Sequence, residues 1–136
     1  MLSERELTNR MLLRARDAID RSYRQELSLT TLAGIAGASR AHFVRSFKET
    51  FGETPHRYLQ RRRIERAMFL LRTTELPIAE VCMEVGFTSL GTFGRTFRDI
   101  VGEAPTVHRA RGPLPPLPGC FIKTWARPST FGEARP

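Results

Sequence analysis

The chain has 136 residues, 40% of them hydrophobic, and its 22 lysines and arginines outnumber its 14 aspartates and glutamates, which gives a formal net charge of +8. This length fits one domain or two very small ones, and the positive charge favours a polyanionic partner, meaning nucleic acid or an anionic membrane surface. No apolar run approaches the roughly 20 residues of a membrane helix. The charged N-terminus lacks the apolar region of a secretory signal. Two cysteines are too few for a disulfide framework or a cysteine-rich zinc site.

The first predicted element is an amphipathic helix near the N-terminus. Ser3 and Glu6 have the spacing of a capping box, so we expect the helix to begin there and to run to about Arg24. Its apolar positions should pack on the segment that follows: Leu12, Leu13, Ile19 and Tyr23.

Two later segments carry the same pattern. SRAHFVRSFKETFGETP begins at Ser39, and SLGTFGRTFRDIVGEAP begins at Ser89. Upstream of each, a short apolar segment ends at a glycine, Gly37 or Gly86, and a serine then opens the next helix. Two copies are too few for a solenoid, so the order of helix, glycine turn and helix predicts a duplicated helix-turn-helix.

The second helix of each copy indicates the function. In the first copy, Phe43, Phe47 and Phe51 form one apolar face, and a different face carries small residues and cations: Ala41, Val44, Arg45 and Lys48. The matching positions in the second copy are Gly91, Gly94, Arg95 and Arg98. Small residues let a helix enter a groove deeply, and arginine can pair with guanine or bind a phosphate, so we expect DNA reading. A solvated basic face on an ordinary core helix is the alternative for either helix alone.

Prolines mark the remaining helix starts. Thr54-Pro55 begins the longest inner helix, which should link the two copies, and Pro77 and Pro105 begin shorter ones. The last helix should be short, from about Pro105 to Ala110. The long helix carries the following core candidates: Tyr58, Ile64, Ala67, Leu70 and Leu71.

The stretch from about Leu27 to Arg109 resembles the DNA-binding domain of the AraC/XylS family of bacterial transcription regulators. The most specific part is PIAEVCMEVGFTSLGTFGRTFRDIVGEAP. The resemblance implies an all-α fold of about seven helices, in which a long linker helix joins two homeodomain-like helix-turn-helix subdomains. The DNA-binding domain would span about residues 1–111, with the motifs at about 28–52 and 77–102 and the linker at about 55–72.

The resemblance also implies which residues touch DNA. The expected base-reading residues are Arg40, Ala41, Val44 and Arg45 in the first copy and Leu90, Gly91, Gly94 and Arg95 in the second. The expected backbone contacts are Ser39, Lys48, Ser89, Thr92 and Arg98.

The second copy departs from the family pattern, because Leu90, Gly91 and Gly94 stand where polar side chains are common. These residues offer no side-chain hydrogen bonds, although Leu90 could touch a thymine methyl group. We therefore expect the first copy to carry most of the base discrimination. The second would act through Arg95, phosphate contacts and DNA shape.

Other reactive residues have simpler interpretations. The three histidines lack metal-ligand spacing and are expected at the surface or as helix caps: His42, His56 and His108. The arginine run Arg61–Arg63 is interpreted as a solvated face. Arg63 could instead form an ion pair with Glu65 or Glu84. Cys82 is expected in the core, and Cys120 is interpreted as an exposed thiol. No Walker loop, HExxH or nucleophile elbow occurs, so we expect no enzyme, metal or cofactor.

The tail, residues 112–136, is a separate zone. It holds six of the nine prolines, which predict an extended or partly disordered segment. The aromatic residues around Phe121 to Trp125 favour partial order or a protein contact instead.

The leading hypothesis is a cytoplasmic, nucleoid-associated, sequence-specific regulator, an activator that contacts RNA polymerase. It would bind double-stranded DNA as a monomer, away from membranes, and have no small-molecule effector site within this chain. The alternatives are an architectural DNA binder with weak sequence choice and a protein-interaction module that uses the aromatic tail.

Overall fold

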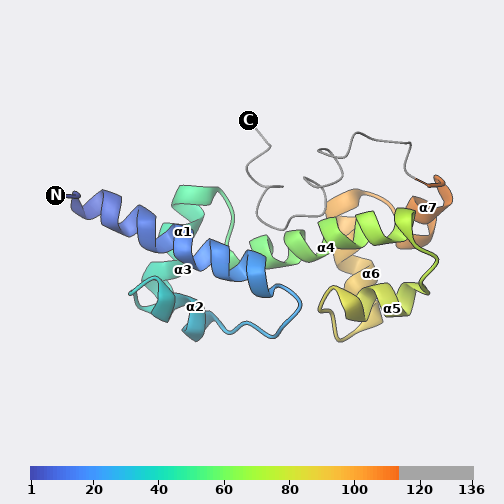
Figure 1. The fold of residues 1–136 in the computed structure, drawn as a ribbon, viewed down its shortest axis with the longest axis horizontal. Helices are drawn as coiled ribbons and strands as arrows, with labels where there is room; N and C mark the ends of the chain where they lie inside the picture. The colour runs from blue at the N-terminus through green and yellow to red at the C-terminus, as the bar shows by residue number, and fades with distance from the viewer. Residues whose placement is uncertain (114–136) are drawn as a thin grey trace. The chain divides into compact units, whose positions relative to one another are not determined.

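The computed structural model describes residues 1–113, which form seven α-helices and no strand (Figure 1). The helices are α1 (Glu4–Ser22), α2 (Leu29–Ile35), α3 (Arg40–Phe51), α4 (Pro55–Thr73), α5 (Ile78–Glu84), α6 (Leu90–Val101) and α7 (Pro105–Ala110). The predicted all-α fold with two helix-turn-helix motifs is confirmed. The predictions for Cys120 and for the aromatic part of the tail lie outside the described residues.

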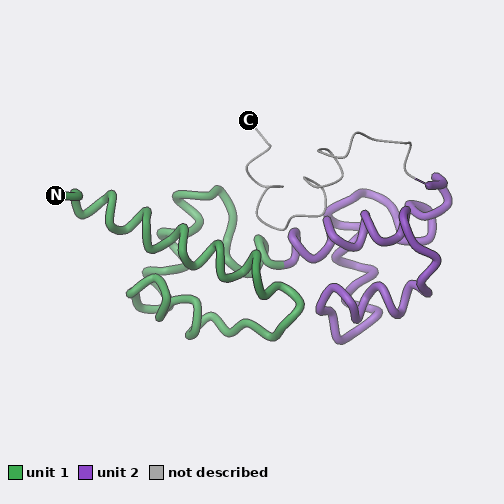
Figure 2. Tube along the Cα trace, in the orientation of Figure 1, with its two compact units in different colours: residues 1–59 green, residues 60–136 purple. Residues whose placement is uncertain are grey.

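The chain divides into two compact units at Leu59 and Gln60, within α4 (Figure 2). Unit 1 contains α1, α2, α3 and the first turn of α4, and unit 2 contains the rest of α4 with α5, α6 and α7. Each unit has a core of its own.

Local sequence signals place the helix ends. The capping box at α1 is present, because the backbone N–H of Glu6 donates to Ser3 Oγ at 3.2 Å and the N–H of Ser3 donates to Glu6 Oε2 at 2.7 Å. Both turns between paired helices contain a glycine with positive φ, 66° at Gly37 and 100° at Gly86, a conformation that other residues rarely adopt. The predicted turns are therefore found at the predicted glycines.

The core of unit 1 forms where α1 packs on α2 and α3. Phe47 lies at its centre, with the rings of Phe43 and Tyr58 each 5.7 Å away between centroids. The Tyr58 hydroxyl donates to the buried carboxylate of Asp20 at 2.8 Å, which ties the start of α4 to α1. The predicted packing of Leu13 was wrong: its side chain is 41% exposed, because it lies about 100° around α1 from the buried Leu12. Helix α1 also ends at Ser22 rather than Arg24.

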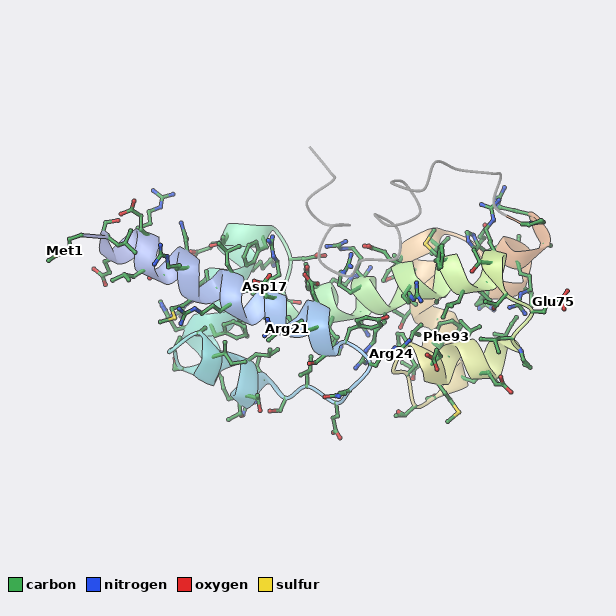
Figure 3. All side chains as sticks on the ribbon, in the orientation of Figure 1. Met1, Asp17, Arg21, Arg24, Glu75 and Phe93 are labelled. Carbon is green, nitrogen blue, oxygen red and sulfur yellow. The ribbon has the colours of Figure 1, made fainter. Side chains whose placement is uncertain are left out.

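The core of unit 2 repeats this arrangement. Phe93 and Phe97 of α6 are fully buried, and Figure 3 shows Phe93 pointing inward among the helices of this unit. Val81 and Cys82 of α5 pack in the same cluster, so the predicted core position of Cys82 is confirmed. Helix α7 closes the unit, and the Arg109 Nε atom donates to the carbonyl of Leu71 at the end of α4 at 3.1 Å.

Two predictions about charged residues were wrong. Arg62 is only 4% exposed, and both it and Arg61 bond to the buried carboxylate of Glu65, so the arginine run is not a solvated face. His108 is buried as well, since its ring lies 5.6 Å from that of Phe97 and its Nδ1 lies 3.2 Å from Glu103 Oε1. Long arginine side chains can cover apolar surface, and the sequence run does not reveal this.

A second ion pair joins the two ends of α7, from Glu103 just before the helix to Arg111 just after it. The carboxylate of Glu103 accepts two hydrogen bonds from the Arg111 guanidinium, both 2.7 Å long. These bonds, together with the His108 contact, lower the pKa of Glu103 from 4.5 to about 2.

We predict that the contribution of Glu103 to stability depends on pH. Because the pKa is lowered in the folded state, this contribution is fully present above pH 4.5 and is lost as the pH falls towards 2. The difference in free energy of unfolding between the wild type and Glu103→Gln should therefore be constant near neutral pH and shrink below pH 4.5. Urea denaturation over a pH series measures this difference. A difference in free energy of unfolding that persists unchanged at pH 2 would contradict the lowered pKa of Glu103. Glu75→Gln, at an exposed position, serves as the control.

Candidate nucleic-acid interface

The exposed face of α3 is set by its buried face. Phe43 and Phe47 are fully buried, which fixes the rotation of α3 about its own axis. The predicted reading positions are accessible to solvent: Ala41, Arg45 and Lys48 lie on the other side and are exposed, Val44 is half-buried, and Arg40 is exposed at the first position of the helix. Ser39 precedes the helix and accepts a hydrogen bond from the N–H of His42 at 3.2 Å.

Helix α6 has the same construction in unit 2. Phe93 and Phe97 face the core, and the predicted positions Leu90, Gly91, Arg95 and Arg98 are exposed, with Gly94 and Thr92 half-buried. Ser89 accepts from the N–H of Thr92 at 3.3 Å. In both units the predicted residues are therefore exposed or half-buried positions on the second helix or at its N-cap.

The electrostatics of both faces suit an anion. Neither α3 nor α6 has an acidic residue in its first turn, so the positive end of each helix dipole is not neutralised locally. Arg40, Arg45 and Lys48 add positive charge to the face of α3, and Arg95 and Arg98 add it to that of α6. Phosphate groups favour such a surface.

The two glycines of the α6 face are not explained by packing among the described residues. A Cβ atom at Gly94 would meet nothing within 4 Å, and one at Gly91 would meet Arg95 Nη1 at 3.5 Å, an ordinary contact. A glycine inside a helix costs about 1 kcal/mol relative to alanine, so the protein keeps two residues here that weaken α6.

Sequence reasoning missed one contact on this face. The Arg95 Nη2 atom donates to Thr92 Oγ1 at 3.4 Å, whereas the sequence analysis assigned Thr92 to the DNA backbone alone. The three-residue spacing on a helix was the available signal. On α3, the corresponding residue His42 instead places Nε2 3.4 Å from Ser46 Oγ.

A metal-binding group and a membrane-spanning helix are both absent from residues 1–113. No group of three or more His, Cys, Asp or Glu side chains in this range is arranged to hold a metal ion. No helix in the same range is long and apolar enough to cross a membrane.

Two helix-turn-helix units, each presenting a basic second helix to solvent, define a DNA-binding domain of the helix-turn-helix class. Residues 32–111 match a family model described as a helix-turn-helix domain. The chain belongs to this family, the AraC/XylS family.

Curated relatives agree with this assignment. The regulatory protein SoxS of Salmonella typhimurium is 34% identical over 93 residues, which cover 68% of this chain and 87% of SoxS. The probable transcriptional regulator LumQ of Photobacterium leiognathi is 30% identical over 91 residues, or 67% of this chain. The chain spans only 37% of the length of LumQ, so it matches one part of that protein.

Solved structures agree as well. The C-terminal domain of AraT, a response regulator from Geobacillus stearothermophilus, matches with a TM-score of 0.72 and 28% identity over 79% of this chain and 90% of that domain. The DNA-binding domain of AdpA, a global transcriptional factor solved with a target DNA, matches with a TM-score of 0.64 and 28% identity over 76% and 90% of the two chains.

We predict opposite effects of alanine at two glycines, Gly94 within α6 and Gly102 at its C-cap. Gly94→Ala should raise the free energy of unfolding by about 1 kcal/mol, because the helix gains propensity and the new Cβ meets nothing. Gly102→Ala should lower it by about 1–2 kcal/mol, because φ is 91° at that position. Chemical denaturation of both variants measures the contrast. A loss of stability in Gly94→Ala would show that the glycine has a structural role in the free protein.

Proposed function

We propose that the protein is a sequence-specific, double-stranded-DNA-binding transcription regulator that inserts α3 and α6 into successive major grooves. The observation that carries the proposal is the pair of basic faces, each exposed because two phenylalanines bury the opposite side of its helix. The similarity to the AdpA domain, which was solved with a target DNA, supports it. Paired readers of this kind favour half-sites about one helical turn apart.

Within this proposal, the residues divide into two roles. Arg40, Ala41, Val44 and Arg45 of α3 face the bases, as do Leu90, Gly91, Gly94 and Arg95 of α6. Lys48 and Arg98, one turn further along each helix, contact phosphates with Ser39, Ser89 and Thr92. The serine hydroxyls already accept the capping N–H, so each can still donate to a phosphate oxygen.

The proposal extends to the setting of the protein. Residues 1–111 form the DNA-binding domain, and residues 112–136 are a separate tail. Since one chain supplies two readers, it binds as a monomer to an asymmetric site. It acts in the cytoplasm on the nucleoid as an activator, with RNA polymerase as its protein partner, and its activity is binding rather than catalysis.

A second candidate is an architectural DNA binder with weak sequence choice. Leu90, Gly91 and Gly94 favour it, because they present no hydrogen-bonding side chain to the bases. Backbone contacts and DNA deformability would then dominate recognition.

Selection from a random duplex library at near-physiological salt distinguishes these functions. We expect a bipartite motif whose halves are about one helical turn apart, since each unit carries one reader. Enrichment of DNA without a motif would favour the architectural function. Failure to retain any DNA would contradict both.

We predict that two neighbouring cations on α3 respond differently to alanine. Arg45→Ala should cost about 1–3 kcal/mol of binding free energy and relax specificity at one base pair. Lys48→Ala should weaken binding to every sequence and reduce the slope of log affinity against log salt by about one. Affinity measurements on matched and single-mismatch duplexes over a salt series give both quantities. Equal weakening of all sequences by Arg45→Ala would show that Arg45 does not read a base.

A further inference from the structure

The guanidinium of Arg95 is held on the outer face of α6 before any ligand is present. Its Nη2 atom donates to Thr92 Oγ1 at 3.4 Å, one turn closer to the start of the helix. Helical side chains tilt towards the N-terminus of their helix, so this bond continues the direction in which Arg95 already extends. The guanidinium therefore lies over the first turns of α6, the part of a recognition helix that contacts base edges.

The absence of a side chain at Gly91 leaves space for this arrangement. The Nη1 atom of Arg95 lies 3.5 Å from the position that a Cβ atom at Gly91 would occupy. Atoms beyond Cβ would compete with the guanidinium for the same region. An alanine Cβ would make only an ordinary contact there, so the restriction applies to side chains longer than alanine.

The first unit lacks this arrangement. At the position of Thr92 it has His42, whose ring approaches Ser46 rather than Arg45. The two arginines occupy matching places in the repeat, but only Arg95 has a hydroxyl partner on the preceding turn.

We infer that Thr92 is a positioning residue that holds Arg95 ready to pair with a guanine, so that α6 selects a single guanine in its half-site; this inference rests on the proposed function. A guanidinium matches the O6 and N7 acceptors of guanine with two hydrogen bonds, and a side chain already held in place loses less freedom on binding. The arginine side chain has five N–H donors, so two can bond to the base while another keeps its hydrogen bond to Thr92 Oγ1. The second half-site should therefore contain one well-defined guanine among weakly specified positions.

The test compares two substitutions at Thr92 in the full chain. Thr92→Val removes the hydroxyl but keeps a β-branched side chain of similar helix propensity. Thr92→Ser keeps the hydroxyl. Arg95→Lys keeps the charge but loses the bidentate guanidinium donor. The base pair at which this variant loses its preference is the one that Arg95 reads. Library selection followed by affinity measurements on duplexes that differ at that base pair gives the preference for guanine.

We expect the wild type to prefer guanine at that base pair about tenfold or more. Thr92→Val should reduce the preference about threefold, since one hydrogen bond is lost. Thr92→Ser should retain it, and all variants should melt within a few degrees of the wild type. An unchanged preference in Thr92→Val, or equal losses in both Thr92 variants, would overturn the inference.

A measurement without DNA separates this inference from the proposed function. Nitrogen-15 relaxation of the Nε groups in the free protein should show Arg95 more restricted than Arg45, and Thr92→Val should remove the difference. Equal mobility of the two arginines would overturn the positioning role even if DNA binding is specific. Restricted Arg95 in a protein that retains no DNA would instead overturn the proposed function and the guanine assignment with it.

Discussion

The burial of two phenylalanines four residues apart on each recognition helix is the constraint on which the interface depends. Phe43 and Phe47 fix the rotation of α3, and Phe93 and Phe97 fix that of α6. With both rings in the core, the residues on the far side of the helix must face solvent. Arg45 and Arg95, each two positions after a buried phenylalanine, are exposed for this reason. The same aromatic contacts that stabilise each unit therefore orient its reading face.

The two units share this construction but differ in what the reading face offers. The caps, the glycine turns and the phenylalanine pairs correspond, whereas Ala41 is replaced by Gly91 and Val44 by Gly94. The two glycines weaken α6, although a Cβ at position 94 would meet nothing within 4 Å and one at position 91 would make only an ordinary contact with Arg95. The two units thus share a scaffold but present different side chains on their second helices.

Helix α4 shows how one element can serve both units. Its first turn contributes Tyr58 to the core of unit 1, and the residues from Ile64 onwards belong to the core of unit 2. Between them lies the arginine run, where Arg62 and Glu65 are almost fully buried and bonded to each other at 2.9 Å. Both Arg61 and Arg62 bond to Glu65, so substitution of Glu65 should be more destabilising than substitution of either arginine alone.

By itself, the sequence determined the helices, the two glycine turns and the residues that face outward on α3 and α6. These follow from local rules: capping serines, prolines at helix starts, glycines with positive φ and apolar residues at helical spacing. Tertiary structure alone decided the burial of Arg62 and His108 and the exposure of Leu13. Each of these depends on which neighbour a long or ambiguous side chain meets after the helices pack, and the spacing of residues along the chain does not contain that information.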